Sequence, residues 1–116
     1  MRKLYIVKNQ YDFDRIIKKQ NIIKNKAFII YKEKNELPYS RFGISVGKKL
    51  GNAVYRNKMK RKIRSIIDTA NKNLIDNNDY IIILRQMAKD YNYNELNEKL
   101  TNLLYRKEQS NEEKTK

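Results

Sequence analysis

Hydrophobic residues recur along this chain in short patterns, each of which predicts a helix or a strand. In residues 11–20 the apolar positions have helical spacing, which predicts a short amphipathic helix. Its apolar side would be formed by Phe13, Ile16 and Ile17. Either Asn9 or Gln10 is expected at its start, where a polar side chain can accept hydrogen bonds from the unpaired N–H groups of the first turn.

Two strands are predicted next, over residues 27–33 and 41–47, because both segments are rich in β-branched and aromatic residues. A polar segment that contains the only proline, Pro38, separates them and indicates a hairpin-like connection. The second strand alternates in character. One face carries Phe42, Ile44 and Val46, and the other carries Arg41, Gly43, Ser45 and Gly47.

Two longer helices and a further strand complete the pattern. Residues 53–72 predict a helix whose core side would hold Met59, Ile63, Ile66, Ile67 and Ala70. Residues 80–84 are apolar at every position, as expected for a strand that is covered on both faces. A last helix should begin near Asn92, which has capping-box spacing to Glu95. Its core stripe would be Leu96, Leu100, Leu103 and Leu104.

The order helix, two or three strands, helix, strand, helix predicts an α+β fold with one antiparallel-rich sheet and one strand–helix–strand crossover. From the sequence alone, a right-handed crossover is expected, because such connections are nearly always right-handed. At 116 residues the chain has room for a single domain, which we place at residues 1–105. Residues 106–116 contain no apolar residue, so we expect a disordered tail.

The charge balance indicates what kind of partner the protein binds. The chain has 27 Lys and Arg against 13 Asp and Glu, a formal net charge of +14, which indicates a polyanion. Cys and His are both absent, which excludes disulfides, thiolate zinc sites and Cys or His nucleophile–base pairs. No apolar run approaches the ~20 residues of a membrane span, and the first residues lack the features of a secretory signal. We therefore expect a cytoplasmic protein without a membrane partner.

The positive charge is concentrated between Gly47 and Arg64, where eight residues are Lys or Arg. No acid occurs from 48 to 67, although acids normally alternate with bases on a solvated helix face. Lys48 and Lys49 lead into the start of the predicted helix, where unpaired N–H groups favour anions. These features favour phosphate binding over a solvated surface without a ligand. The segment GKKLGN does not have the spacing of a nucleotide P-loop.

A second candidate surface is the side of the second predicted strand that is almost bare of side chains. Gly43, Ser45 and Gly47 would form a shallow floor that something can approach closely. Tyr31 on a neighbouring strand and Phe13 on the first helix could border this floor. Aromatic groups, small residues and flanking lysines suit an unpaired strand of nucleic acid. The alternative is that Phe13 and Tyr31 belong only to the core.

The distribution of carboxylates predicts no catalytic centre. A protein nuclease needs clustered metal-binding acids or an acid–base set. The aspartates are scattered over helix starts and turns, where capping explains them: Asp12, Asp14, Asp68, Asp76, Asp79 and Asp90. We therefore expect no self-sufficient catalytic site in this chain.

One long segment resembles a known family. The sequence FGISVGKKLGNAVYRNKMKRKIR is similar to the signature of the bacterial ribonuclease P protein subunit, and DFDRII, FIIY and DYIIILR extend the resemblance over residues 4–105. The resemblance implies a small two-layer sandwich like domain 2 of ribosomal protein S5, with an unusual left-handed crossover. It also implies that a separate RNA subunit with bound Mg²⁺ cleaves the 5′ leader from precursor tRNA, and that the protein residues alone bind no metal.

The same resemblance assigns roles to two sets of residues. It implies that the protein steadies the catalytic RNA through Arg56, Asn57, Lys58, Lys60, Arg61 and Arg64. It implies that a cleft binds the leader of precursor tRNA through Phe13, Ile17, Tyr31, Ser45, Lys48 and Lys49. Lys58 stands where the Arg-Asn-Arg motif of the family has its second arginine. Ile17 stands where many members have a second aromatic residue.

Two other functions are compatible with the pattern of residues. A structural RNA-binding protein, such as a ribosomal protein, could use the same basic helix without a role in processing. A DNA-binding architectural protein would carry a similar excess of positive charge. The nucleic acid that copurifies with the protein would distinguish these two functions from that of a ribonuclease P subunit.

Overall fold

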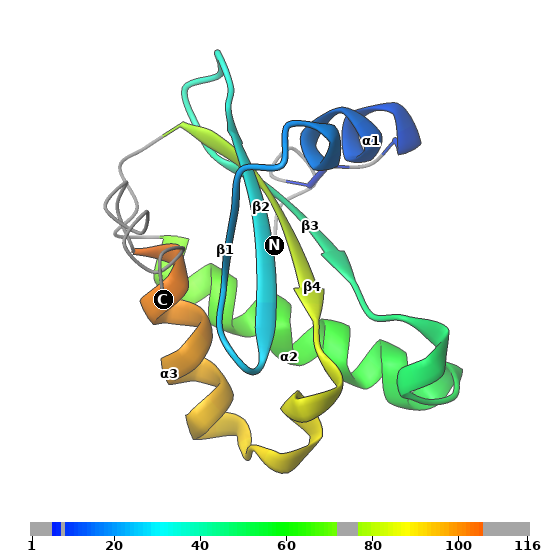
Figure 1. Ribbon diagram of the computed structural model, residues 1–116. Coiled ribbons are helices and arrows are strands. Elements are labelled where there is room, and N and C mark those ends of the chain that lie inside the picture. Colours follow the sequence, from blue (N-terminus) through cyan, green and yellow to red (C-terminus); the bar gives the residue numbers. More distant parts are fainter. Residues whose placement is uncertain (1–5, 8, 72–76, 106–116) are drawn as a thin grey trace.

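The computed structural model describes residues 6–7, 9–71 and 77–105 and shows the expected α+β fold (Figure 1). Its helices are α1 (Gln10–Lys18), α2 (Ala53–Asn71) and α3 (Tyr93–Leu104). Its strands are β1 (Ile22–Lys24), β2 (Phe28–Lys34), β3 (Arg41–Ser45) and β4 (Asn78–Leu84). Two short 3₁₀ helices, η2 (Lys48–Leu50) and η3 (Gln86–Asp90), precede α2 and α3. Residue 72, the last of the second predicted helix, lies outside the described residues. Asp76 and the predicted tail also lie outside them.

The helix ends follow local capping. The side-chain oxygen of Asn9 accepts the N–H of Asp12 at 2.8 Å, so Asn9 rather than Gln10 caps α1. At α3, Asn92 accepts the N–H of Glu95 at 2.8 Å, and the Glu95 carboxylate accepts the N–H of Asn92 at 2.9 Å. This confirms the predicted capping box. The core stripes predicted for α2 and α3 are buried throughout.

The four strands form one sheet in the order β1–β2–β4–β3. β2 pairs antiparallel with β1 and with β4, whereas β3 pairs parallel with β4. The predicted hairpin-like connection between residues 27–33 and 41–47 is therefore wrong, because β4 lies between these two strands. The connecting residues carry turn signals, but the strand that separates β2 from β3 comes from a distant part of the chain.

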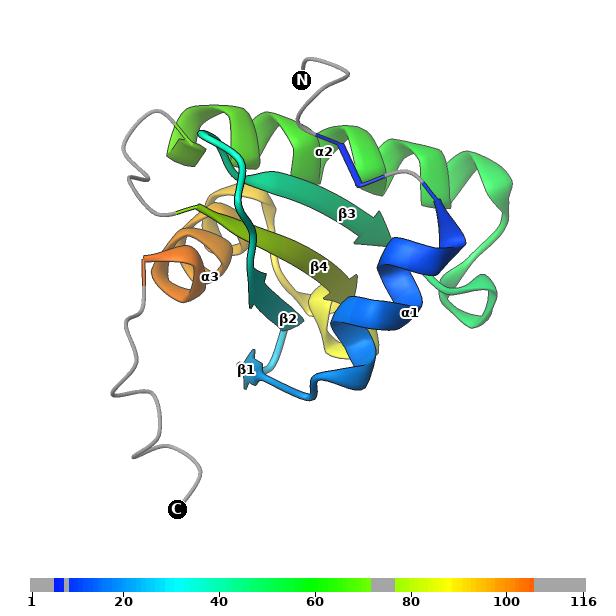
Figure 2. The same cartoon turned by 90° about the horizontal axis from the view of Figure 1, so that it is seen from above.

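The unit β3–α2–β4 is the strand–helix–strand crossover expected from the sequence. In Figure 1 both strands run downward, β4 lies to the left of β3, and α2 passes behind the sheet. Figure 2 shows α2 on that same side from above. These positions make the crossover left-handed, against the general preference for right-handed connections and as the family resemblance implied.

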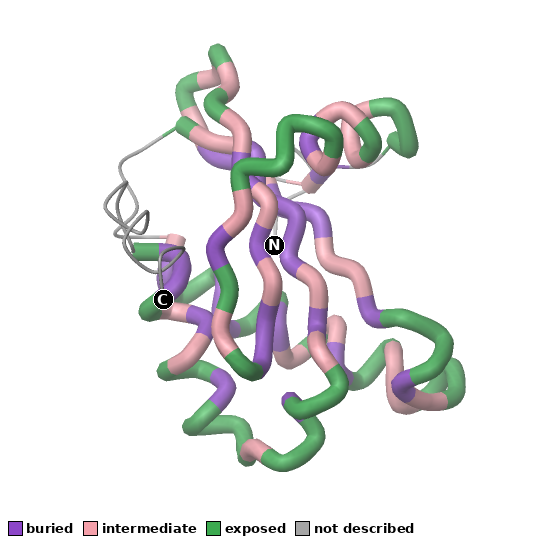
Figure 3. Tube along the Cα trace, in the orientation of Figure 1, coloured by how far each residue is buried: buried purple, intermediate pink, exposed green. Residues whose placement is uncertain are grey.

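The main hydrophobic core lies between the sheet and the layer formed by α2 and α3 (Figure 2). β2 and β4 face it with alternate residues, namely Phe28, Ile30, Tyr80, Ile82 and Leu84. Phe42 of β3 stacks on Tyr80 with ring centroids 5.3 Å apart. Figure 3 shows that buried positions run through the middle of the sheet, as expected for a central β4.

A smaller core lies on the opposite face of the sheet, against α1. Its buried members are Val7, Ile16 and Ile81, and half-buried residues pack around them: Phe13, Tyr31 and Ile83. β4 therefore contributes to both cores, which confirms the prediction that this strand is covered on both faces. In Figure 1, α1 lies near the upper ends of the strands, and among the described residues no helix lies in front of their lower ends.

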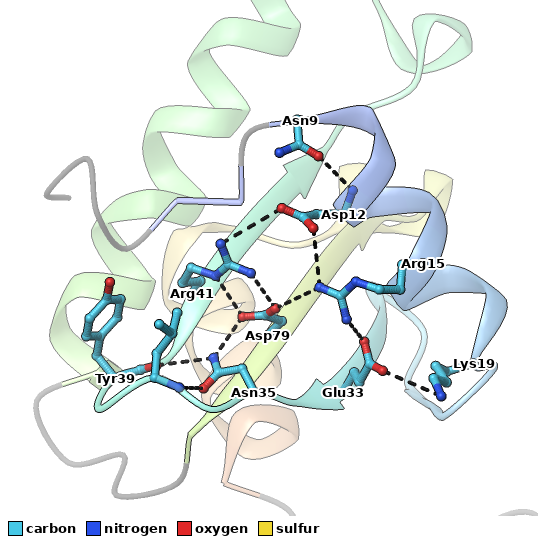
Figure 4. Close-up of polar contacts among 10 residues, drawn as sticks. Asn9, Asp12, Arg15, Lys19, Glu33, Asn35, Tyr39, Arg41 and Asp79 are labelled. Atoms are coloured by element: carbon cyan, nitrogen blue, oxygen red, sulfur yellow. Dashed lines mark hydrogen bonds and ion pairs between the residues drawn. The ribbon is translucent and has the colours of Figure 1, made fainter.

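An ionic network fastens α1 to this face of the sheet (Figure 4). Asp79 of β4 is only 1% exposed and accepts hydrogen bonds from Nε and Nη2 of Arg41 at 2.9 and 2.7 Å. Asn35 donates to the same carboxylate at 2.8 Å, and Arg15 of α1 donates to it at 3.4 Å. Arg15 also pairs with Glu33 of β2. One buried carboxylate thus joins α1 to the edge of the sheet.

The network determines the ionisation of Asp79. Burial alone would raise the pKa of this carboxyl group, but the hydrogen bonds from Arg41, Asn35 and Arg15 and the charge of Arg41 together hold the pKa below its ordinary value. The hydrogen bond to Asp79 in turn raises the pKa of Arg41. Folding therefore favours the ionised form of Asp79.

We predict that Asp79→Asn lowers the free energy of unfolding at pH 7 by about 2–4 kcal/mol, because it leaves two arginines without their buried counter-charge. The loss is smaller than for a fully buried pair, since the Arg41 side chain is 21% exposed. The unfolded-state pKa of Asp is about 3.9. Because the folded-state pKa is lower, the advantage of the wild type is complete above that pH and is lost as the pH falls through the folded-state value. Urea unfolding between pH 7 and pH 3 measures both effects.

Asp90→Asn is the matched control, since Asp90 is exposed and the same charge is removed. It should change the free energy of unfolding by less than about 0.5 kcal/mol. If Asp79→Asn were as stable as this control at pH 7, the network would contribute nothing to the fold.

Candidate nucleic-acid interface

The first candidate surface is the outer side of α2. Asn52 begins this helix, since its side-chain oxygen accepts the N–H of Tyr55 at 2.9 Å and its backbone carbonyl accepts the N–H of Arg56 at 2.9 Å. The buried residues of the helix all face the main core: Met59, Ile63, Ile66, Ile67 and Ala70. The basic residues are consequently displayed on the sides that face away from the sheet.

All six residues predicted to bind the RNA subunit lie on this helix. Four of them are exposed, namely Asn57, Lys58, Arg61 and Arg64. Arg56 and Lys60 are half-buried. Nε of Arg56 donates to the carbonyl oxygen of Gly51 at 3.3 Å, which holds this side chain against the turn before the helix. The structure therefore gathers the predicted set on one strongly basic helix.

The second candidate surface is the sheet face that α1 covers only in part. The strand register arranges side chains of this face in rows across the sheet. One row consists of Ile22, Tyr31, Ile81 and Gly43. The neighbouring row consists of Lys24, Ile29, Ile83 and Ser45. Tyr31, Ile29, Ile83 and Ser45 are half-buried, so part of each side chain remains accessible.

Gly43 does not form an open floor, contrary to the prediction. It is buried, and a Cβ atom at this position would lie 2.6 Å from the tip of the Phe13 ring and 2.9 Å from Cδ1 of Ile81. The missing side chain therefore makes room for Phe13 and not for a ligand. The accessible floor is formed instead by Ser45 and Ile83, in the next row.

Phe13 and Ile17 lie one turn apart on α1, and both are half-buried. Phe13 packs against the smaller core through Gly43, so the alternative that it is a core residue is correct in part. Tyr31 packs against the same core from β2. Both aromatic side chains retain exposed surface beside the open part of the face.

The end of β3 also differs from the prediction. The strand ends at Ser45, and Gly47 precedes η2, with nothing within 4 Å of the position of a Cβ atom. Gly47 is therefore open to close approach, although it is not part of the strand. Lys48 and Lys49 are exposed in η2, on the segment that connects the sheet to α2.

Ile29 and Ile83 line the accessible face but were not predicted as site residues. Each is one member of a continuous apolar run in the sequence. The register pairs Ile29 with Ile83, and Ile83 with Ser45, which places both on the open side. The two-residue alternation of a strand was the available signal, because Ile29 lies two positions before Tyr31.

The two candidate surfaces lie on opposite faces of the sheet. Figure 2 shows α2 behind the strands and α1 on the other side of them. η2, with Lys48 and Lys49, links β3 to the start of α2 and so lies between the two surfaces.

Two negative findings concern the described residues. Within 6–7, 9–71 and 77–105, no group of three or more His, Cys, Asp or Glu residues could hold a metal ion. In that same part of the chain, no helix has the length and apolar character needed to cross a bilayer. What the arrangement can do chemically is to bind phosphates on one side and an unpaired strand on the other.

Sequence comparisons identify close relatives of this chain. The family model of ribonuclease P matches residues 1–108. The ribonuclease P protein component of Mesoplasma florum is 46% identical over 109 residues, which cover 90% of this chain and 99% of the relative. The ribonuclease P protein component of Streptococcus pneumoniae strain CGSP14 is 37% identical over 121 residues, which cover 100% of this chain and 98% of the relative.

Solved structures give the same result. The RNase P protein of Staphylococcus aureus matches with a TM-score of 0.79 and 44% identity, over 86% of this chain and 92% of that protein. The RNase P protein of Thermotoga maritima matches with a TM-score of 0.81 and 33% identity, over 88% of this chain and 96% of that protein. Since the family match spans nearly the whole sequence, this chain belongs to the ribonuclease P protein family.

Proposed function

We propose that this chain is the protein component of ribonuclease P and that it binds both the RNA subunit and the 5′ leader of precursor tRNA. One observation carries the proposal: a chain of this family places two unlike surfaces on opposite faces of one sheet. A basic helix suits the phosphates of a structured RNA. A half-open apolar and aromatic face suits a strand whose bases are unpaired.

On the α2 side, binding rests on charge and on the geometry of the donors. Arg61 and Arg64 are exposed and can each present a planar fork to phosphate oxygens. Lys58 stands about one turn before Arg61 as a point charge. Because these groups contact phosphates, they fix the position of the RNA without selecting its sequence.

On the α1 side, binding of the leader rests on stacking and close approach. Phe13 and Tyr31 offer partly exposed rings, and Ile29 and Ile83 supply an apolar surface between the strands. Bases can stack on such rings whatever their identity. Lys48 and Lys49, exposed beyond the end of β3, can hold the phosphates of the same strand.

We assign the cleavage chemistry to the RNA subunit. Mg²⁺ bound by that RNA would stabilise charge at the reacting phosphate and activate water. The protein residues do not fit a site for this ion, since no group of three or more His, Cys, Asp or Glu in the described part of the chain could hold a metal ion. The protein would act by holding the two RNAs together, in the cytoplasm where tRNA is matured.

The purified protein, freed of RNA, should leave a 5′-extended tRNA uncut in the presence of Mg²⁺ and should support cleavage once the cognate RNA subunit is added. The physical reason is that the sequence has no His or Cys and that the described residues hold no group of acids that could bind a metal ion. A gel assay with labelled precursor measures both. Cleavage that survives ribonuclease treatment during purification would contradict the first expectation. Failure to support the RNA subunit would favour a purely structural RNA-binding protein.

Affinity for the RNA subunit should depend steeply on salt. If about five basic residues of α2 contact phosphates, the slope of log K against log salt should be about −3 to −5. Arg61→Ala should flatten this slope by up to about one unit, because one phosphate contact is lost. Lys34→Ala is the matched control, since Lys34 is exposed at the end of β2. Filter binding from low to high salt measures the slopes, and a wild-type slope near zero would point to an apolar partner.

Removal of the accessible rings should weaken binding of the leader specifically. We expect Tyr31→Ala and Phe13→Ala to reduce the affinity of the holoenzyme for leader-bearing tRNA by about 1–3 kcal/mol per stacked base lost. Affinity for mature tRNA should stay nearly unchanged. Equilibrium binding of both RNAs to each variant is the measurement.

Tyr11→Ala is the control for this comparison, because Tyr11 lies on the same helix and is 75% exposed. Thermal unfolding of Phe13→Ala separates loss of binding from loss of packing against Gly43. Equal losses for leader-bearing and mature tRNA would show that the two rings serve only the core.

A further inference from the structure

A cavity of about 540 Å³ lies between the first half of α2 and the segment from η3 to the start of α3. This volume lies within the range of sites that bind small ligands. α2 contributes Tyr55, Met59 and Lys62, whose spacing places them on one side of the helix. The cavity faces away from the sheet surface on which α1 packs, since Met59 belongs to the main core.

The lining of this cavity combines apolar, aromatic and cationic groups. The wall opposite α2 is formed by Lys89, Tyr91 and Leu96. Met59 and Leu96 are buried and supply an apolar floor. Lys62 and Lys89 supply positive charge, and no acid occurs among the described residues that line the cavity. A ligand that is flat and apolar at one end and anionic at the other matches this lining.

The two tyrosine rings are oriented by their neighbours. A Cβ atom at Gly51 would lie 2.6 Å from the ring of Tyr55, so this glycine lets the ring lie against the backbone. Nζ of Lys89 lies 5.5 Å from the centroid of Tyr55, and Nζ of Lys99 lies 4.7 Å from that of Tyr91. Burial raises the pKa of Tyr55, so its hydroxyl group keeps its proton and can donate a hydrogen bond.

We propose that this cavity binds one unstacked nucleotide of the RNA subunit. The base lies against the rings of Tyr55 and Tyr91, and its phosphate lies near Lys62 and Lys89. Splayed bases of RNA bind in this way to aromatic side chains flanked by cations. The inference rests on the proposed function and adds to it a defined site on the side of α2 nearest to α3.

Continuity with the basic surface favours RNA as the occupant. Lys62 directly follows Arg61 on α2, so a strand that binds the exposed side of the helix passes close to the cavity. A purely apolar ligand would desolvate the ammonium groups of Lys62 and Lys89 without compensation. A simple anion would leave the apolar floor and the two rings unused.

Methyl NMR of the full chain tests whether a nucleotide enters the cavity. Met59, Ala88 and Leu96 line it and provide methyl signals. We expect adenosine 5′-monophosphate to shift these signals in a saturable manner and inorganic phosphate to leave them in place. Tyr55→Leu should weaken nucleotide binding at least about fivefold, which corresponds to the loss of one stacking contact. Equal shifts with phosphate alone would show that the cavity does not recognise a nucleotide, which would overturn the proposal.

Equilibrium binding of the RNA subunit tests the assignment to that RNA. Tyr55→Leu should bind it about five- to thirtyfold more weakly, whereas Tyr55→Phe, which keeps the ring, should stay within about threefold of the wild type. Tyr11→Leu is the matched control, because Tyr11 is an exposed residue of α1, and it should stay within about twofold of the wild type. Thermal unfolding of each variant checks that the fold is retained, and a Tyr55→Phe loss as large as that of Tyr55→Leu would overturn stacking.

Arg61→Ala separates this inference from the proposed function. If Arg61→Ala weakens RNA binding and Tyr55→Leu does not, the basic helix binds RNA but the cavity does not, and the inference fails alone. If neither variant weakens binding, the proposed function of α2 fails as well. If adenosine 5′-monophosphate binds but Tyr55→Leu retains full affinity for the RNA, the cavity takes a free nucleotide and the assignment to RNA is overturned.

Discussion

The double burial of β4 is the constraint on which both layers of the molecule depend. Ile81 is buried against α1 and Ile82 is buried against the layer of α2 and α3. The strand also carries Asp79, which binds Arg41 of the neighbouring strand and Arg15 of α1. A central strand of this kind must be apolar on both sides, so it holds the two candidate surfaces apart while it joins them through one backbone.

This arrangement also determines where the acids and bases of the chain are used. Asp12, Glu33 and Asp79 form ion pairs with Arg15 and Arg41 beneath α1, so these charges stabilise the fold. The sequence from 48 to 67 contains no acid at all. Like charges on α2 repel one another, and a bound polyanion would offset this cost. The same composition therefore pairs its charges on one face and leaves unbalanced positive charge on the other.

Features that depend on neighbouring residues could be predicted from the sequence, and features that depend on distant residues could not. The side chains of Asn92 and Glu95 each accept the backbone N–H of the other residue within one turn, so the start of α3 was predicted correctly. The order of the strands was missed because β4 inserts between β2 and β3 from far along the chain. Gly43 was misinterpreted because a glycine pattern shows that space exists and not which group fills it.

The candidate sites follow the same rule: groupings set by neighbouring residues could be predicted, and groupings set by distant residues could not. The helical repeat grouped Asn57, Lys60, Arg61 and Arg64, and the family resemblance added Arg56 and Lys58 on the same helix. The accessible sheet face needed the register, which alone places Ile29 beside Ile83. The cavity between α2 and η3 gave no signal, because Tyr55 and Tyr91 are brought together only by the packing of α3 against α2.

The physical difference between the two faces is what would let one small domain bind two RNAs, as the proposed function requires. Phosphates of a structured RNA are recognised by charge at long range, which suits exposed Arg and Lys side chains on a rigid helix. Bases of an unpaired strand are recognised at contact distance, which suits half-buried rings and small residues on a sheet. The bases of a duplex are already paired and stacked, so they would not be free to stack on Tyr31. In the proposed function, each face would therefore recognise its RNA by charge and shape rather than by base sequence.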